Sequence, residues 1–244
     1  MRVVCFYLLL ILSQSCLFAQ STSYKLFKTG FQGFAGVTNE NYLNNMVEGW
    51  FNDIAEANNG YLSEDPILLP FNIEYGYQPF FTVHPTRFLQ IGMKLDVGYS
   101  NLVAEFQNET TNQSYDYQIK VRSYTPGLFS YLTLGKFEIG GGLIHSFSNV
   151  NVKDDFFGYY DTWYGKDFGY EIIMGFSTSK EKPVGFTMSI KYRGLLIGNY
   201  EDSFNRDIII QNGHDKIMLD MSGFIISMGL YGQFLKIDRQ KDAN

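Results

Sequence analysis

One histidine and two serines stand close together in the run His145-Ser146-Phe147-Ser148-Asn149. A histidine within reach of a serine hydroxyl is a general base beside a nucleophile, the arrangement used in acyl transfer. In a strand, however, adjacent side chains face opposite ways and side chains two apart share a face. His145 shares its face with Leu143 and Phe147, whereas both serines point to the other face. We therefore expect no catalytic residues here, unless a bulge restores the pairing.

A larger set of titratable residues alternates with apolar ones. In residues 87–100 (RFLQIGMKLDVGYS) the odd positions are apolar from Leu89 to Tyr99, and Lys94 and Asp96 lie on the opposite parity. Such a strand has one apolar face and one polar face. The polar faces are predicted to enclose paired charges, because an unpaired buried charge is expensive. The predicted lumen charge network comprises Glu74, Lys94, Asp96, Lys120, Arg122, Glu138, Glu171, Lys191 and Arg193. Its functional alternative is a narrow polar path or ligand pocket.

Eight segments show this strand pattern. They are residues 24–37, 69–81, 87–106, 115–134, 137–150, 168–178, 184–200 and 217–235. The alternation is blurred at Thr125-Pro126-Gly127, which predicts a bulge. Long connections (38–68, 107–114, 151–167 and 201–216) alternate with short turns. Outer-membrane barrels have short periplasmic turns and longer outer loops. We therefore predict an all-β fold, an eight-stranded antiparallel up-and-down transmembrane β-barrel.

Composition agrees with this prediction. The 244 residues include 22 Phe, 18 Tyr and 24 Gly, and barrels use aromatic rings at their interfaces. The net charge of −6 and the lack of a basic stripe argue against nucleic acid as a partner. A mean hydropathy of −0.13 argues against a helical membrane protein.

The first residues resemble a secretory signal. Arg2 precedes an apolar run over residues 3–12, and cleavage is expected after Ala19. The domains are then a signal peptide, 1–19, and a barrel domain, 20–244. Both cysteines, Cys5 and Cys16, lie in the signal, so the mature chain has no thiol for a disulfide or a metal. The alternatives are lipidation of Cys16 and an uncleaved anchor. We expect no metal and no cofactor.

One helix is predicted over residues 41–58, in the first outer loop. Its apolar residues recur at helical spacing. They are Leu43, Met46, Val47, Trp50, Phe51 and Ile54. The helix is expected to dock on the rim or lumen of the barrel. The alternatives are a helix in the lipid interface and a partner-binding helix.

The mature chain resembles small eight-stranded outer-membrane barrels of Gram-negative bacteria, especially those common in Bacteroidetes. The resemblance rests on the strand pattern, on the signal ending Phe18-Ala19-Gln20 and on the last aromatic strand. Residues 229–234 (GLYGQF) look like the C-terminal signal of such barrels, although ten residues follow Phe234. The resemblance implies an outer-membrane location. It implies as partners the outer-membrane lipid, lipopolysaccharide and, during biogenesis, the barrel-assembly machinery.

Three functions remain open at this point. The first is a non-enzymatic barrel, structural or binding a surface partner through acidic and aromatic loops such as residues 154–161. The second is a small channel or transporter for small or apolar molecules, with a lateral opening at Pro126. The third is a lipid A-modifying enzyme, because outer-membrane lipid A deacylases carry an H-x-S-N motif. This chain departs from that motif with H-x-x-S-N at His145.

Overall fold

The computed structural model describes most of the predicted barrel. The described residues are 24–39, 48–49, 51–52, 71–107, 114–155, 158–178, 182–198, 200–201, 207–208, 211–212, 215–216 and 218–237. The predicted signal peptide lies outside them. So does nearly all of the predicted helix, in which Phe51 is the one apolar residue described.

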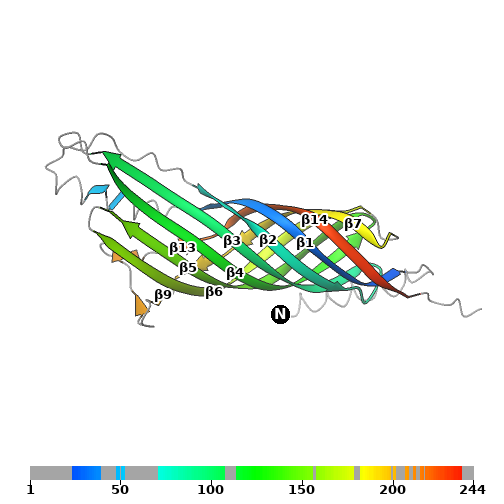
Figure 1. Ribbon diagram of the computed structural model, residues 1–244. Helices are drawn as coiled ribbons and strands as arrows, with labels where there is room; N and C mark the ends of the chain where they lie inside the picture. Colours follow the sequence, from blue (N-terminus) through cyan, green and yellow to red (C-terminus); the bar gives the residue numbers. More distant parts are fainter. Residues whose placement is uncertain are drawn as a thin grey trace, which may run out of the picture.

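Eight long strands form a closed antiparallel ring (Figure 1). They are β1 (Tyr24–Asn39), β2 (Phe71–Val83), β3 (Leu89–Gln107), β4 (Ser114–Leu134), β5 (Phe137–Asp154), β6 (Tyr159–Ser177), β7 (Val184–Gly194) and β14 (Gly223–Ile237). Each strand pairs with its neighbours in this order, and β14 closes the ring on β1. The prediction of an eight-stranded barrel is thereby confirmed.

Six strands of two residues each lie between β7 and β14. They are β8 (Leu196–Ile197), β9 (Tyr200–Glu201), β10 (Asp207–Ile208), β11 (Gln211–Asn212), β12 (Asp215–Lys216) and β13 (Leu219–Asp220). The predicted seventh and eighth strands were too long here, since β7 ends at Gly194 and β14 begins at Gly223.

The predicted long loop after the fifth strand is wrong. Residues 151–154 continue β5 and residues 159–167 begin β6, so only residues 155–158 connect the two strands. The paired positions run as far as Asp154 opposite Tyr159. Polar and aromatic residues that looked like a loop therefore form a long hairpin.

The two ends of the barrel differ. The short connections 84–88, 135–136 and 178–183 lie at the end where β1 starts and β14 finishes. At the other end the β3–β4 and β5–β6 hairpins extend well beyond the rest of the ring (Figure 1). We call this the hairpin end, and the opposite one the terminal end.

An apolar belt covers the outer wall. Its large exposed side chains include Leu128, Leu143 and Met174, each more than half exposed. At the terminal end the Phe27 ring stacks 5.5 Å from Phe234, and toward the hairpin end Tyr192 meets Phe224 at 5.3 Å. Phe224 and Phe234 are ten positions apart on β14. That separation corresponds to roughly 25 Å along the axis at the usual strand rise and tilt.

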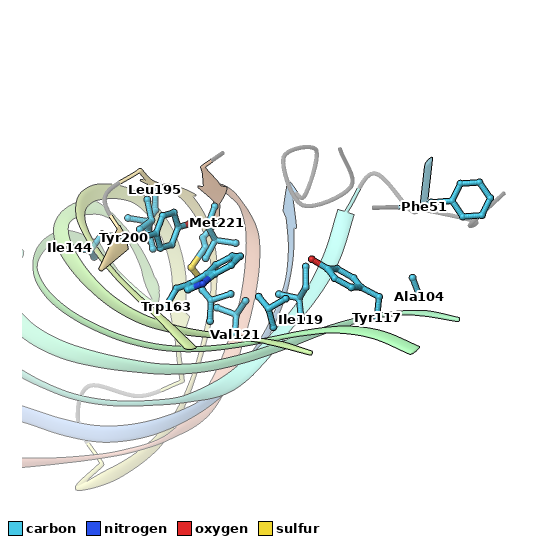
Figure 2. Close-up of a cluster of buried hydrophobic side chains, with 14 residues drawn as sticks. Phe51, Ala104, Tyr117, Ile119, Val121, Ile144, Trp163, Leu195, Tyr200 and Met221 are labelled. Atoms are coloured by element: carbon cyan, nitrogen blue, oxygen red, sulfur yellow. The ribbon is translucent and has the colours of Figure 1, made fainter. Parts of the chain in front are cut away.

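The interior at the hairpin end is apolar. Tyr117, Ile119 and Val121 of β4 point to the concave side, where Val121 lies beside Trp163 and Met221 (Figure 2). Other buried members of this cluster come from the segment after β7, namely Leu195, Ile197, Tyr200 and Leu219. That segment therefore fills the barrel mouth with apolar side chains.

The predicted bulge at Thr125-Pro126-Gly127 is absent from the β3–β4 ladder, where Leu95 pairs with Pro126 in an unbroken register from Leu89 to Gln107. Even-numbered side chains of β4 face outward on both sides of Pro126, as Arg122 and Leu128 do. The face of the strand does not change. The polarity of the two faces reverses instead, because the residues that point into the barrel at the hairpin end are apolar.

Candidate functional site

Six buried charged side chains meet in the middle of the barrel, and we call them the central cluster. Arg193 donates from Nη1 to Glu74 at 2.9 Å, from Nη2 to Asp96 at 2.8 Å and from Nε to Glu171 at 3.1 Å. Lys94 donates to Asp96 at 2.9 Å and also to Glu171. Lys191 lies 3.5 Å from Asp96. Three cations thus face three anions.

The alternation of the strands brings these side chains together. Lys94 and Asp96 are two residues apart on β3, so both point inward, and Lys191 and Arg193 do the same on β7. Gly98 leaves room for the Glu74 carboxylate, because a Cβ at Gly98 would collide with Glu74 Oε1. Four strands, β2, β3, β6 and β7, therefore contribute to one cluster.

A second buried pair lies closer to the terminal end. Lys28 of β1 donates to Glu138 of β5 at 3.1 Å and to the Ser177 hydroxyl at 3.0 Å. Gln90 donates to the same Glu138 oxygen at 2.8 Å. The Lys28 ammonium also lies 4.6 Å from the Tyr231 ring centre, a cation–π contact.

Together the central cluster and this pair contain four cations and four anions, so the charges of these two groups balance. Asp154, near the hairpin end of β5, is a further buried carboxylate. Each ion of the two groups has hydrogen-bonded partners, the condition under which buried charges are tolerated. A cavity of about 20 Å³ between Lys28, Gln90 and Tyr131 is the space left beside them, room for about one water molecule. Side chains fill this part of the barrel.

Seven of the nine residues predicted for the lumen are buried in the interior: Glu74, Lys94, Asp96, Glu138, Glu171, Lys191 and Arg193. The other two are placed wrongly by the sequence. Lys120 and Arg122 are exposed on the outer wall of β4, since the inward face there carries Ile119 and Val121.

Lys28 belongs to the interior and was missed by the sequence prediction, whereas Gln78 lies on the inward face that it shares with Glu74. Gln78 accepts a hydrogen bond from Lys191. In β1 the alternation of Phe27 and Phe31 against Lys28 and Gln32 was the available signal. It was obscured because inward Phe34 is apolar and much of the outward face is glycine and alanine.

The histidine and serines of residues 145–149 are not brought together. His145 lies on the outer wall, where its ring stacks 4.1 Å from Phe168 and lies 4.4 Å from Phe147. Ser146 and Ser148 are buried inside, and their hydroxyls are 3.3 Å apart. A base on one face of the sheet cannot take the proton of a hydroxyl on the other face.

Two further predictions bear on sites. Phe51 is 8% exposed and belongs to the buried apolar cluster, whereas the other apolar residues of the predicted helix lie outside the described residues. Across the described part of the chain, acidic, histidine and cysteine side chains form no group of three suited to a metal ion. A helix long and apolar enough to span a membrane is likewise not found there.

No family model matches this sequence, and no curated protein matches it. Several solved structures have a similar strand arrangement. The outer membrane protein OprG from Pseudomonas aeruginosa superposes with a TM-score of 0.47 at 14% identity, over 86% of this chain and 97% of that chain. The attachment invasion locus protein Ail of Yersinia pestis gives 0.44 at 10% identity, over 87% and 99%.

Neisserial surface protein A gives a TM-score of 0.38 at 12% identity, over 87% of this chain and 99% of that chain. These neighbours are outer-membrane β-barrel proteins of Gram-negative bacteria. At such low scores and identities, their individual activities say nothing about this chain.

Proposed function

We propose that this chain is a non-enzymatic outer-membrane β-barrel that acts as a structural or surface-binding protein. The neutral, closed central cluster carries the proposal. A lumen filled by paired charges has no continuous aqueous path, so function is assigned to the outer surface and the hairpin end. The resemblance to Bacteroidetes barrels, and cleavage after Ala19, stay predictions from the sequence.

The outer wall supports the membrane location. The apolar belt is bounded by aromatic rings at both ends, and its height of roughly 25 Å matches the lipid-facing band of such barrels. The start of β1, the end of β14 and the short turns share the terminal end, which we assign to the periplasm. The hairpin end then projects from the cell.

Three measurements test this function. The protein refolded in detergent should migrate differently on a gel before and after boiling, as a closed barrel does, and it should show no steady conductance in planar bilayers. Deletion of residues 149–164, the β5–β6 hairpin beyond the belt, should leave migration unchanged and remove binding of any surface partner recovered from intact cells. Steady conductance of the wild type would overturn the structural proposal.

One observation favours a second candidate, sideways passage of a small apolar molecule. Pro79 and Pro126 have no N–H to give to a ladder. The β2–β3 pairing pauses between Tyr77 and Phe80, and the β4–β5 pairing pauses between Tyr124 and Gly127. An apolar groove of about 810 Å³ crosses the outer wall at this level. Lys94 is among the residues that line this groove.

This second candidate predicts uptake without conductance. Vesicles containing the wild-type barrel should take up a fluorescent apolar probe faster than empty vesicles. Pro79→Val combined with Pro126→Val restores two ladder donors and should slow that uptake. Equal rates in empty vesicles, wild type and variant would rule the candidate out.

A further inference from the structure

Two basic side chains stand next to each other on the outer wall, just beyond the apolar belt. Arg122 and Lys120 are two residues apart on β4, so they share a face. The inward neighbours Ile119 and Val121 are buried in the apolar cluster, as Figure 2 shows, so Arg122 and Lys120 point away from the barrel. Both are exposed.

These two cations differ from their neighbours in lacking an acidic partner. On the adjoining β5–β6 hairpin, Lys153 pairs with Asp155 at 2.8 Å and Lys166 pairs with Glu201 at 2.9 Å. Within the described part of the chain, no carboxylate lies within ion-pair distance of Arg122 or Lys120. Their charge is available to an external anion.

The surroundings hold Arg122 in place. Its guanidinium lies 5.4 Å from the Tyr99 ring centre and 5.0 Å from the Tyr124 ring centre, so the two tyrosines support it by cation–π contacts. These tyrosines lie at the edge of the belt toward the hairpin end. The guanidinium donors are therefore fixed at the depth where lipid head groups begin.

Amide side chains continue the site on the next strand. Asn149 pairs with Arg122 across the ladder, and Asn151 pairs with Lys120. The Asn151 side-chain oxygen accepts a hydrogen bond from the Thr162 hydroxyl at 2.8 Å. This contact leaves the Asn151 amide nitrogen to donate to another group. Two cations flanked by amide donors suit a phosphate group, which accepts several charge-assisted hydrogen bonds.

We propose that Arg122 and Lys120 form a binding site for a phosphate of lipopolysaccharide in the outer leaflet. The site is on the lipid-facing wall, so its ligand is itself a membrane lipid. The hairpin end faces outward under the proposed function, on which this inference rests. A phosphate monoester of lipopolysaccharide carries more charge than a phospholipid diester, which matches two adjacent cations.

The test measures binding to the folded mature chain in a neutral detergent. Purified lipopolysaccharide is titrated, and binding is followed by native mass spectrometry. The double variant Lys120→Gln with Arg122→Gln should bind roughly tenfold more weakly. The matched control, Lys153→Gln with Lys166→Gln, removes the same charge from the same wall and should change binding by less than about twofold.

Further arms identify the ligand. Dephosphorylated lipopolysaccharide should bind the wild type as weakly as the intact lipid binds the double variant. Lys120→Arg with Arg122→Lys keeps both charges and should retain most of the affinity. Phosphatidylglycerol and inorganic phosphate should compete poorly.

The proposal is overturned if both double variants lose affinity equally, if neither does, or if phosphatidylglycerol or inorganic phosphate displaces the lipid at equal concentration. Migration before and after boiling is measured for every variant. A barrel that migrates normally but binds no lipopolysaccharide refutes this site alone, whereas abnormal migration of the wild type refutes the membrane barrel.

Discussion

The Arg193 guanidinium lies 2.9 Å from the Glu74 carboxylate, although 119 residues separate them in the sequence. Their strands, β7 and β2, are not neighbours in the ring. The pair therefore crosses the barrel interior, and both side chains are fully buried. Arg193 also contacts Asp96 and Glu171, which makes it the hub of the central cluster.

Removal of that hub should be strongly destabilising. Arg193→Met leaves three carboxylates facing two lysines in a buried site, so we expect a loss of about 3–5 kcal/mol in the free energy of unfolding. Urea titration in detergent micelles measures it. Lys166→Gln breaks an exposed pair and should cost no more than about 1 kcal/mol. Equal losses in the two variants would show that the cluster is not stabilised by Arg193.

The Lys28–Glu138 pair should show coupling in a double-mutant cycle. Lys28→Met alone leaves Glu138 without its cation, and Glu138→Gln alone leaves Lys28 without its anion. The double variant should be more stable than the sum of the two single losses predicts, with an interaction energy of about 1–3 kcal/mol. The same urea titrations supply the four free energies. Additive losses would mean that the two charges act independently.

The edge of the membrane can be located by an arginine placed at two depths. Leu128 is 67% exposed in the middle of the apolar belt, and Val103 is 51% exposed on the hairpin beyond it. In lipid bilayers, Leu128→Arg should cost about 2–4 kcal/mol and Val103→Arg about 0–1 kcal/mol. Refolding titrations in vesicles compare them. Similar costs at both positions would contradict the placement of the belt.

Gly98 should tolerate no added methyl group. A Cβ there would lie 2.6 Å from the Ser123 hydroxyl and would push the Glu74 carboxylate away from Arg193. We expect Gly98→Ala to cost about 1–3 kcal/mol. Gly175 also lies in the barrel wall, but its nearest neighbours to a Cβ are at 3.5 Å, so Gly175→Ala serves as the tolerated control. Thermal unfolding ranks the two variants.

Tyr159, at the tip of the β5–β6 hairpin, should ionise at a higher pH than an ordinary tyrosine. Partial burial and the hydrogen bond that Tyr159 donates to Asp161 at 2.8 Å raise its pKa to about 12. The folded hairpin thus favours the neutral phenol. The neutral phenol's contribution to folding stability is fully present below the ordinary tyrosine pKa of about 10 and is lost as pH rises toward 12. Near pH 10 the wild type and Tyr159→Phe should show the same phenolate absorbance, because Tyr159 is still neutral. The absorbance of the wild type should exceed that of the variant only at higher pH.

Asp161→Asn is the companion to that titration. It removes the anion that holds the phenol proton, so the pKa of Tyr159 should fall back toward 10 while the effect of burial remains. A wild-type Tyr159 that already ionises near pH 10 would mean that the Tyr159–Asp161 hydrogen bond does not persist in solution.

The strands could be predicted because alternation is strict where one wall faces an apolar environment and the other faces charges. In β14 the outward residues are Phe224, Ile226, Met228 and Leu230, as expected. The pattern failed where that contrast reverses. Along β4 the outward residues change from Leu128 to Arg122 without any change of face, and a pattern of polarity alone interprets such a reversal as a bulge.

The interior charges were predictable one by one, but their partners were not. Parity indicates that Arg193 and Glu74 point inward, yet the strand register and ring closure decide which inward ions meet. The inward position of Lys28 was not predicted, because its own strand has few large side chains on the outward face. The hairpin over residues 151–167 was predicted to be a loop, because its outward residues are polar and aromatic, as loop residues often are.

The charge balance of the central cluster and the Lys28–Glu138 pair has a consequence for membrane insertion. Lys28 comes from the first strand, Arg193 from the seventh, and the carboxylates that they meet lie on strands between. In an open sheet Arg193 could still meet Glu171 on the adjacent strand β6, and Lys94 could meet Asp96 on its own strand, but Lys28 would be separated from Glu138 and Arg193 from Glu74. These two pairs cross the barrel and form only when β14 closes on β1, so partly inserted intermediates should be unstable and barrel closure should occur in one cooperative step.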